Sequence, residues 1–359
     1  MSTLDKVKFT NFRNLSEQVI SLKPSINCIF GENGNGKTNV LEAIHLSINK
    51  KSFRKKAGFQ QILSVDCEKP EIISNLTLKN HEGIDYYTIC WDQNNFSCFK
   101  NNEIKIRKPN TNCVFISPFD SFSFHNESSF RRNLIDSFIG RFDNFYKKTI
   151  SDYSKLLKQK NHVLKFSKDD KHLDAIDKIL AEKINIINSR RLNFINDINP
   201  YLGHIYQEIF SEHVELKLEL NSVFNNFSTN ECYLKLQENR KIDLESRISK
   251  IGPNRDEIQL IFNGFDSIEF CSLGQQKTAY LSLLFAYIKL FGYKFRVFPI
   301  VLIDDVSGEL DSIRLDLLIK YLFNANYQVV LTTANNEFKN KLEVLGNINL
   351  INVKDGYFN

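Results

Sequence analysis

The chain has 359 residues, of which 42% are hydrophobic and 25% charged, so it can bury a sizeable core and is not a disordered protein. This length predicts one large domain or two ordinary ones. The net charge of +5 is too small to establish a nucleic-acid partner. Seven cysteines without a CxxC pair argue against a disulfide framework or a zinc site. No run approaches the roughly 18 apolar residues of a membrane helix, so a cytoplasmic location is expected.

The first part of the chain alternates apolar and polar residues in the manner of β-strands. Strands are predicted at 6–10, 25–30, 72–78 and 84–91, and at 96–99 and 103–107 on either side of a turn at Asn101 and Asn102. From about residue 136 only Gly140, Pro200 and Gly203 interrupt a helical pattern, which predicts a mainly helical arm at 137–250. The polar segment SKDDKH, 167–172, is predicted to be the tip of a helical hairpin.

After the arm the pattern returns to alternating helices and strands. Helices are predicted at 274–290 and 313–323, and strands at 299–303 and 328–331. We therefore expect the two outer parts of the sequence, 1–136 and 251–359, to form one discontinuous α/β domain.

The strongest motif is GENGNGKT, 31–38, which matches the phosphate-binding pattern G-x-x-x-x-G-K-[ST] between a predicted strand and a predicted helix. Its glycines let backbone N–H groups face phosphates, its lysine reaches the β- and γ-phosphates, and its threonine offers a hydroxyl to Mg²⁺. ATP and Mg²⁺ are therefore the expected cofactors, and the alternative, an ordinary glycine-rich turn, does not account for the flanking elements. The residues predicted to bind the nucleotide here are Gly31, Glu32, Asn33, Gly34, Asn35, Gly36, Lys37, Thr38 and Asn39.

A second motif is FPIVLIDDVSGELD, 298–311, an apolar strand that ends in two carboxylates. Nucleotides bind at the carboxyl ends of the strands in open α/β sheets. Asp304 is predicted to hold Mg²⁺ together with Thr38, and Asp305 to orient or deprotonate the attacking water, with Lys37 as its catalytic partner. The alternative is a strand that ends in an aspartate-rich turn, and the phosphate loop in the same chain argues against it.

A third motif begins at Cys271 with CSLGQQKTAY. Ser272 can cap the following helix, and Gln275 can reach back to complete a capping box. The same geometry presents the Ser272 hydroxyl and the Gly274 amide at a helix N-terminus, which favours anion binding. Two copies paired head to tail would enclose each γ-phosphate between a phosphate loop and this motif, so an ATP-dependent homodimer is predicted.

Together these motifs resemble the RecF family of the SMC group of ABC-type ATPases, and the resemblance covers nearly the whole chain. Further segments that look like landmarks of that family are Phe12-Arg13-Asn14, Ser52-Phe53-Arg54, Arg131-Arg132 with Asp136, LLKQKNHVLK (156–165), GPNRD (252–256) and SGELD (307–311). The resemblance implies an α/β fold with an ABC-type P-loop ATPase head. Residues 1–136 would supply its phosphate loop, 251–359 its signature and Walker B elements, and 137–250 an inserted arm.

The resemblance also implies a function in DNA repair and replication and in the SOS response to DNA damage. An ATP-driven dimer would clamp DNA at junctions of duplex and single strands and help RecR and RecO to load RecA, and weak DNA-dependent ATP hydrolysis would reset it. Two positions depart from most ABC-type ATPases. Asp305 stands where they carry Glu, which implies slow hydrolysis, and Thr332-Thr333 stands where a histidine usually senses the γ-phosphate.

Basic residues form clusters that could neutralise a DNA phosphate track. These residues are Lys50, Lys51, Arg54, Lys55 and Lys56, then Lys105, Arg107 and Lys108, and on the arm Lys147, Lys148, Lys155, Lys158, Lys160 and Lys165. The alternative is that the arm lysines are only the solvated face of a helix, and that Arg131 and Arg132 are structural partners of carboxylates.

Three other functions are open at this point. The chain could be a P-loop phosphotransferase with the helical insertion as a lid, a scaffold with a structural nucleotide, or an ABC subunit of a transporter. The helix start at Ser272 argues against the phosphotransferase, because a kinase has no need for a second phosphate-facing helix.

Overall fold

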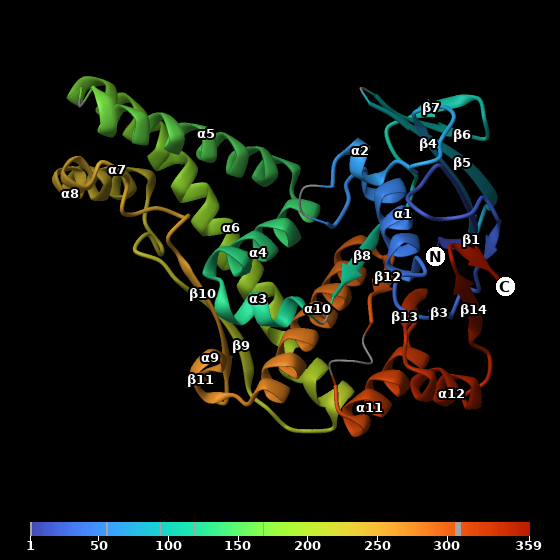
Figure 1. Ribbon diagram of the computed structural model, residues 1–359. Coiled ribbons are helices and arrows are strands. Elements are labelled where there is room, and N and C mark those ends of the chain that lie inside the picture. Colours follow the sequence, from blue (N-terminus) through green and yellow to red (C-terminus); the bar gives the residue numbers. More distant parts are fainter. Residues whose placement is uncertain (1, 55–56, 94, 118, 168, 306–309) are drawn as a thin grey trace. The chain divides into compact units, whose positions relative to one another are not determined.

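The computed structural model describes residues 2–54, 57–93, 95–117, 119–167, 169–305 and 310–359 (Figure 1). The chain divides into two compact units. Unit 1 comprises 1–120, 208–211 and 288–359, and unit 2 comprises 121–207 and 212–287. Within the described residues, no helix is long and apolar enough to cross a membrane. The arm boundaries at 137 and 250 stay a prediction.

The central sheet of unit 1 has the strand order β15-β14-β3-β13-β12-β8. Its strands are β3 (Ile26–Phe30), β8 (Cys113–Ile116), β12 (Ile300–Ile303), β13 (Val329–Thr333), β14 (Asn349–Lys354) and β15 (Tyr357–Phe358). All pairs are parallel except β14 with β15. The strands β3, β12 and β13 are almost entirely buried, as expected for parallel strands covered on both faces. The carboxyl ends of these strands therefore meet at one edge.

A second, antiparallel sheet of unit 1 has the order β2-β1-β4-β5-β6-β7. Its strands are β1 (Thr3–Thr10), β2 (Ile20–Ser21), β4 (Glu71–Asn80), β5 (Gly83–Asp92), β6 (Phe96–Lys100) and β7 (Ile104–Ile106). The predicted turn is confirmed, with Asn101 and Asn102 both in the left-handed region that asparagine tolerates. Alternation along β1 and β4 buries one face of the sheet, as the strand pattern predicts.

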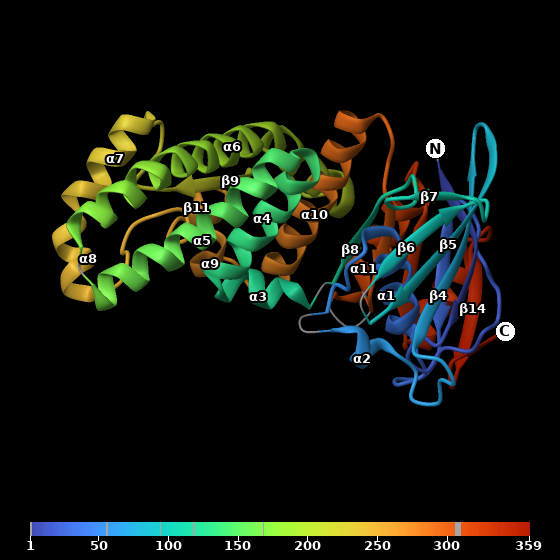
Figure 2. The ribbon, with the colours of Figure 1, turned by 90° about the horizontal axis from the view of Figure 1, so that it is seen from above.

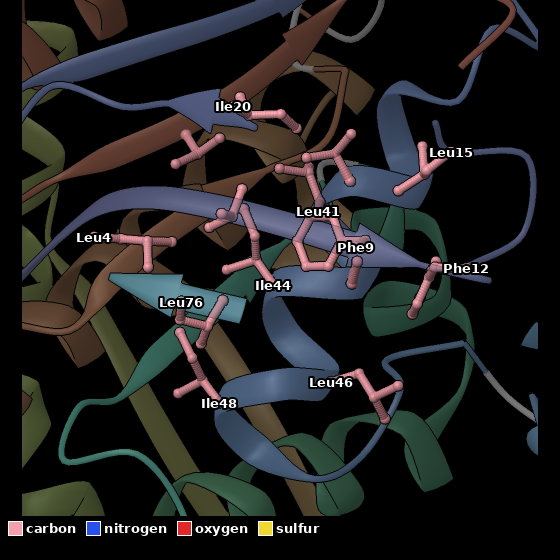
Figure 3. Packing of buried hydrophobic residues seen from close by; sticks show 14 of the residues in the cluster. Leu4, Phe9, Phe12, Leu15, Ile20, Leu41, Ile44, Leu46, Ile48 and Leu76 are labelled. Atoms are coloured by element: carbon pink, nitrogen blue, oxygen red, sulfur yellow. The ribbon is translucent and has the colours of Figure 1, made fainter. Parts of the chain in front are cut away.

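The core of unit 1 lies between this antiparallel sheet and helix α1 (Lys37–Asn49). Figure 3 shows Leu4, Phe9 and Leu76 of the sheet packed near Leu41 and Ile44 of the helix. Val40, Leu41 and Ile44 have no solvent exposure. The amino end of α1 follows the phosphate loop directly, so this packing also fixes the position of that loop.

Further helical segments of unit 1 are α2 (Phe59–Ile62), α11 (Ser312–Phe323), α12 (Asn336–Val344), the last part of α10 (Leu273–Phe295) and the end of α6 (Asp170–Phe210). Asp311 caps α11 by accepting from the Arg314 amide, and Asn335 caps α12. The helix predicted at 313–323 and the strand predicted at 328–331 are confirmed within one or two residues.

Unit 2 is mainly helical (Figure 2). Its helices are α3 (Asp120–Asn126), which begins at the unit boundary, α4 (Ser128–Phe142), α5 (Asn144–Phe166), α6 (Asp170–Phe210), α7 (Thr229–Glu238), α8 (Arg240–Ser246), α9 (Ser267–Phe270) and most of α10. The predicted helical hairpin is confirmed, because α5 ends at Phe166 and α6 begins at Asp170. Pro200 and Gly203 do not end α6, which continues to Phe210.

Unit 2 also contains a three-stranded antiparallel sheet in the order β11-β10-β9. The strands are β9 (Leu216–Asn221), β10 (Glu257–Phe262) and β11 (Phe265–Asp266). The sequence LKLELN of β9 alternates strictly and buries Leu216, Leu218 and Leu220. The sequence analysis did not predict β9, because six alternating residues were read as part of the surrounding helical pattern.

Candidate nucleotide site

The phosphate loop connects β3 to α1 in the predicted way. Gly34 and Gly36 have φ angles of 88° and 104°, in the left-handed region that favours glycine. A side chain at Gly31 would place its Cβ 2.2 Å from the carbonyl oxygen of Val353. These glycines are therefore required by backbone conformation and by close approach, and not only by the motif.

Two distant segments of unit 1 support the loop. Asn39 donates to the Asn14 side chain over 2.7 Å, and the Gly356 amide donates to the Asn35 carbonyl over 3.1 Å. A Cβ at Gly356 would lie 1.8 Å from the Asn14 carbonyl oxygen, so the N-terminal and C-terminal segments meet beside the loop. The sequence analysis missed the C-terminal part, although the dipeptide Asp355-Gly356 between two short strands is a typical hairpin signal.

Lys37 points back into the loop from the first position of α1. Its Nζ donates to the carbonyl oxygens of Gly31 and Glu32 over 2.8 and 2.9 Å. Burial lowers the pKa of Lys37, and the nearby carboxylates of Asp305 and Asp304 oppose that shift. The ammonium group is thus held between the loop carbonyls and two carboxylates, in the place where a phosphate would add a further negative partner.

Asp304 follows β12 and lies between two threonine hydroxyls. Thr38 lies 2.9 and 3.0 Å from its two carboxylate oxygens, and the Thr332 hydroxyl donates to Oδ1 over 2.7 Å. Burial raises the pKa of Asp304, and the bonds from Thr332 and Thr38 act in the opposite direction. The predicted pair of Thr38 and Asp304 is therefore brought together, from elements more than 260 residues apart in the sequence.

Asp305 lies next to this pair in a conformation that is uncommon for a side-chain-bearing residue. Its φ angle is 41°, and its amide donates to the Thr332 hydroxyl over 3.0 Å. Such left-handed residues cluster at functional sites when the surroundings hold them in place. The structure thus places Lys37, Thr38, Asp304 and Asp305 in one site of unit 1.

Oxygen ligands at this site fit magnesium. Mg²⁺ is usually held by one or two protein oxygens, with water and phosphate oxygens filling its other positions. The Thr38 hydroxyl and the Asp304 carboxylate supply such oxygens within 3 Å of each other. Among the described residues, no group of three or more His, Cys, Asp and Glu could hold a metal ion by itself.

Glu42 on α1 joins two of the segments that resemble family landmarks. This fully buried carboxylate accepts from Arg13 Nε over 2.6 Å and from the Ser52 hydroxyl over 2.5 Å, and it lies 3.1 Å from Arg54 Nη1. The segments Phe12-Arg13-Asn14 and Ser52-Phe53-Arg54 therefore meet on one side chain. The sequence analysis had no signal for Glu42, because it lies outside every motif.

The predicted capping box at the start of α10 is confirmed. The Gln275 side chain accepts from the Ser272 amide over 2.9 Å, and the Gln275 amide donates to the Ser272 hydroxyl over 3.3 Å. Ser272, Gly274 and Gln275 belong to unit 2, and Ser272 is exposed. A helix N-terminus with an accessible hydroxyl can receive an anion from another molecule.

One predicted DNA contact is wrong. Lys160 has no solvent exposure and lies 3.0 Å from Asp177 and 2.9 Å from Asp243, both also fully buried. Arg131 and Arg132 have structural partners, which was the alternative to a DNA contact. Arg131 pairs with Glu257 over 3.0 Å, and Arg132 donates to the Asp256 carbonyl over 2.8 Å.

Parts of two predicted groups lie outside the described residues. These are Lys55 and Lys56 of the first basic cluster, and Ser307, Gly308 and Glu309 of the SGELD element.

Known proteins resemble the chain over nearly its whole length. The model of the AAA domain family matches residues 6–294. The DNA replication and repair protein RecF of Clostridium beijerinckii is 30% identical, with 98% of this chain and 96% of that protein covered, and RecF of Clostridioides difficile is 28% identical over 98% and 97%.

Solved structures agree in fold. A structure of the recombination mediator RecF with ATP, from the RecFOR pathway, covers 100% of this chain and 97% of its own, with 25% identity and a TM-score of 0.81. An SMC head domain from Pyrococcus furiosus covers 100% and 95%, with 14% identity and a TM-score of 0.56, which concerns the fold alone. The predicted fold class is confirmed.

Proposed function

Because the chain belongs to the RecF family of DNA replication and repair proteins, we propose that it is an ATP-driven DNA clamp of recombinational gap repair. Two copies pair head to tail when each binds ATP and Mg²⁺, and the dimer holds DNA at junctions of duplex and single strands. With RecR and RecO it helps RecA to replace single-strand binding protein. The dimer is reset by slow, DNA-dependent ATP hydrolysis in the cytoplasm.

The single observation that carries this proposal is the meeting of Thr38, Asp304 and Asp305 beside the phosphate loop. Lys37 and the loop amides bind the phosphates, and Thr38 and Asp304 hold the metal. Mg²⁺ bound there would supply charge neutralisation to the phosphates. Asp305 orients the attacking water, and its short side chain accounts for slow turnover. The other residues of the loop, Gly31 to Gly36 and Asn39, supply the remaining contacts to the nucleotide.

The signature residues Ser272, Gly274 and Gln275 support a second, intermolecular contact to the γ-phosphate. Their helix start is capped internally, but Ser272 remains exposed. If one copy binds ATP and the other copy contacts its γ-phosphate, the dimer depends on ATP. This dependence separates the clamp from a phosphotransferase, which needs no second copy to complete its nucleotide site.

The α5 helix supports DNA as the acidic partner. Five of its lysines are exposed and share one stripe of the helix, because successive members are separated by one, three or seven residues. The members are Lys147, Lys148, Lys155, Lys158 and Lys165. The stripe is roughly 27 Å long at 1.5 Å per residue. Asp152, which is partly exposed, lies 3.9 Å from Lys155 and is a weak partner.

Sedimentation of the purified chain tests the composite site. We expect a monomer without nucleotide and a dimer with ATP and Mg²⁺, and we expect Ser272→Arg to bind ATP normally but remain a monomer, because the new side chain blocks the phosphate-facing helix start. Ser189→Arg, an exposed serine on α6, is the control for added charge and bulk. An ATP-dependent dimer of Ser272→Arg would exclude the composite site, and a wild-type monomer under all conditions would favour the phosphotransferase.

A further inference from the structure

Thr332 lies at the end of β13, the strand between β3 and β12. Leu331 pairs with Ile303, the last residue of β12, so Thr332 lies level with the carboxylates that follow that strand. Its side chain has no solvent exposure. The position is therefore fixed by the sheet and not by a loop.

The hydroxyl of Thr332 makes two bonds of opposite direction. The Asp305 amide can only donate, so over 3.0 Å the Thr332 oxygen accepts from it. The single hydroxyl hydrogen then points to Asp304 Oδ1 over 2.7 Å. One hydroxyl thus links the backbone of the second carboxylate to the side chain of the first.

These bonds restrict both aspartates. The donation to Oδ1 limits rotation of the Asp304 carboxylate, whose two oxygens also lie within 3.0 Å of Thr38. The acceptance from the amide holds Asp305 at a φ of 41°, a conformation that needs support from its surroundings. Val has the shape of Thr but can make neither bond.

We infer that Thr332 is a positioning residue that orients Asp304 toward the metal and Asp305 toward the attacking water, a role that rests on the ATPase function proposed above. It acts through the two aspartates that it bonds. The structure thus gives Thr332 a role in which its hydroxyl serves both as donor and as acceptor.

The test compares Thr332→Val with Thr332→Ser and with Thr149→Val, which removes a buried hydroxyl that bonds only to the Phe145 carbonyl. A fluorescent ATP analogue is titrated at increasing Mg²⁺, and ATP turnover is measured in parallel. Outer-shell partners of metal ligands typically contribute about tenfold or more to metal affinity. We expect Thr332→Val to raise the half-saturating Mg²⁺ concentration and to lower kcat by about that factor, with metal-free analogue binding unchanged.

The serine variant should restore both values, because it keeps the hydroxyl, and Thr149→Val should leave both unchanged. A merely structural role would lower the midpoint of thermal unfolding of Thr332→Val without changing its Mg²⁺ dependence, and that result would overturn the inference. Wild-type Mg²⁺ dependence in Thr332→Val would overturn it as well. If the wild-type chain binds the analogue but does not hydrolyse ATP, the proposed function fails, and the Mg²⁺ dependence of binding still decides the role of Thr332.

Discussion

At the scale of single residues, the site depends on buried polar groups whose partners come from distant segments. Glu42 makes this clear, since its carboxylate receives donors from two loops that follow different elements. Arg13 and Arg54 side chains are 19% and 35% exposed, so they keep some contact with water, whereas Glu42 has none. If the cluster is broken, the two arginines can therefore regain contacts with water, whereas the buried Glu42 carboxylate cannot.

Glu42→Gln should destabilise unit 1 by about 3 kcal/mol, at the lower end for breaking a buried ion pair because both arginines can partly rehydrate. Urea unfolding followed by fluorescence checks this, since Trp91 is the only tryptophan and lies in unit 1 beside Phe59. Glu103→Gln, an exposed site between β6 and β7, is the control. Equal urea midpoints for the two variants would show that the cluster adds no stability.

At the scale of elements, helix α5 presents two lysine faces with different tasks. Lys158 is exposed on the basic stripe, whereas Lys160 is buried against α6 and α8 through Asp177 and Asp243. Arg240 of α8 also pairs with Asp177 over 2.9 Å, so the ion pairs join three helices. These two lysines are only two positions apart, but Lys160 holds the arm together and Lys158 faces solvent.

Lys160→Met and Lys158→Met should therefore change different properties of the protein. Lys160→Met leaves Asp243 buried without its lysine, so hydrogen exchange in α5, α6 and α8 should accelerate by a factor that corresponds to about 3 kcal/mol. DNA affinity of the folded protein should not change. Lys158→Met should weaken DNA binding and leave hydrogen exchange unchanged.

Trp91 fluorescence gives the internal control for this pair, because it reports on unit 1 and should be the same in both variants. Faster exchange after Lys158→Met, or weaker DNA binding after Lys160→Met with exchange unchanged, would contradict the assignment of the two faces.

At the scale of the whole molecule, local patterns in the sequence predicted many of the helices and strands, but they could not predict long-range contacts. The phosphate loop, the strand before Asp304 and the capping box at Ser272 were predicted because each depends on neighbouring residues. The bonds of Thr332 to two aspartates, the support of the loop by Gly356 and the role of Glu42 depend on folding.

The burial of Lys160 could have been predicted. It lies four residues after Leu156 and three before Val163, on the apolar stripe of α5, and α6 carries Asp177 beside its own apolar residue Ile176. A charged residue in such a stripe needs a buried partner of opposite sign. The helical spacing in the sequence therefore contained the signal, but the charge alone suggested a surface position.

The distribution of charge over the molecule gives the last prediction. A net charge of +5 gives little general attraction, so the proposed DNA affinity depends on where exposed and at most weakly paired lysines are concentrated. Each lysine that neutralises a phosphate contributes about 0.9 to the slope of log affinity against log salt. Replacing Lys148, Lys155 and Lys158 by glutamine should therefore weaken DNA binding and reduce that slope by about 3.

The matched control replaces Lys8, Lys79 and Lys100 by glutamine, which changes the net charge equally but removes lysines paired with Glu17, Asp5 and Asp85. Affinity for a gapped duplex is measured at several salt concentrations for both triple variants. Since paired lysines release few counterions, the control should keep the wild-type slope. Equal loss in both variants would mean that DNA responds to total charge, and a flat salt dependence in the wild type would mean that α5 makes no phosphate contacts.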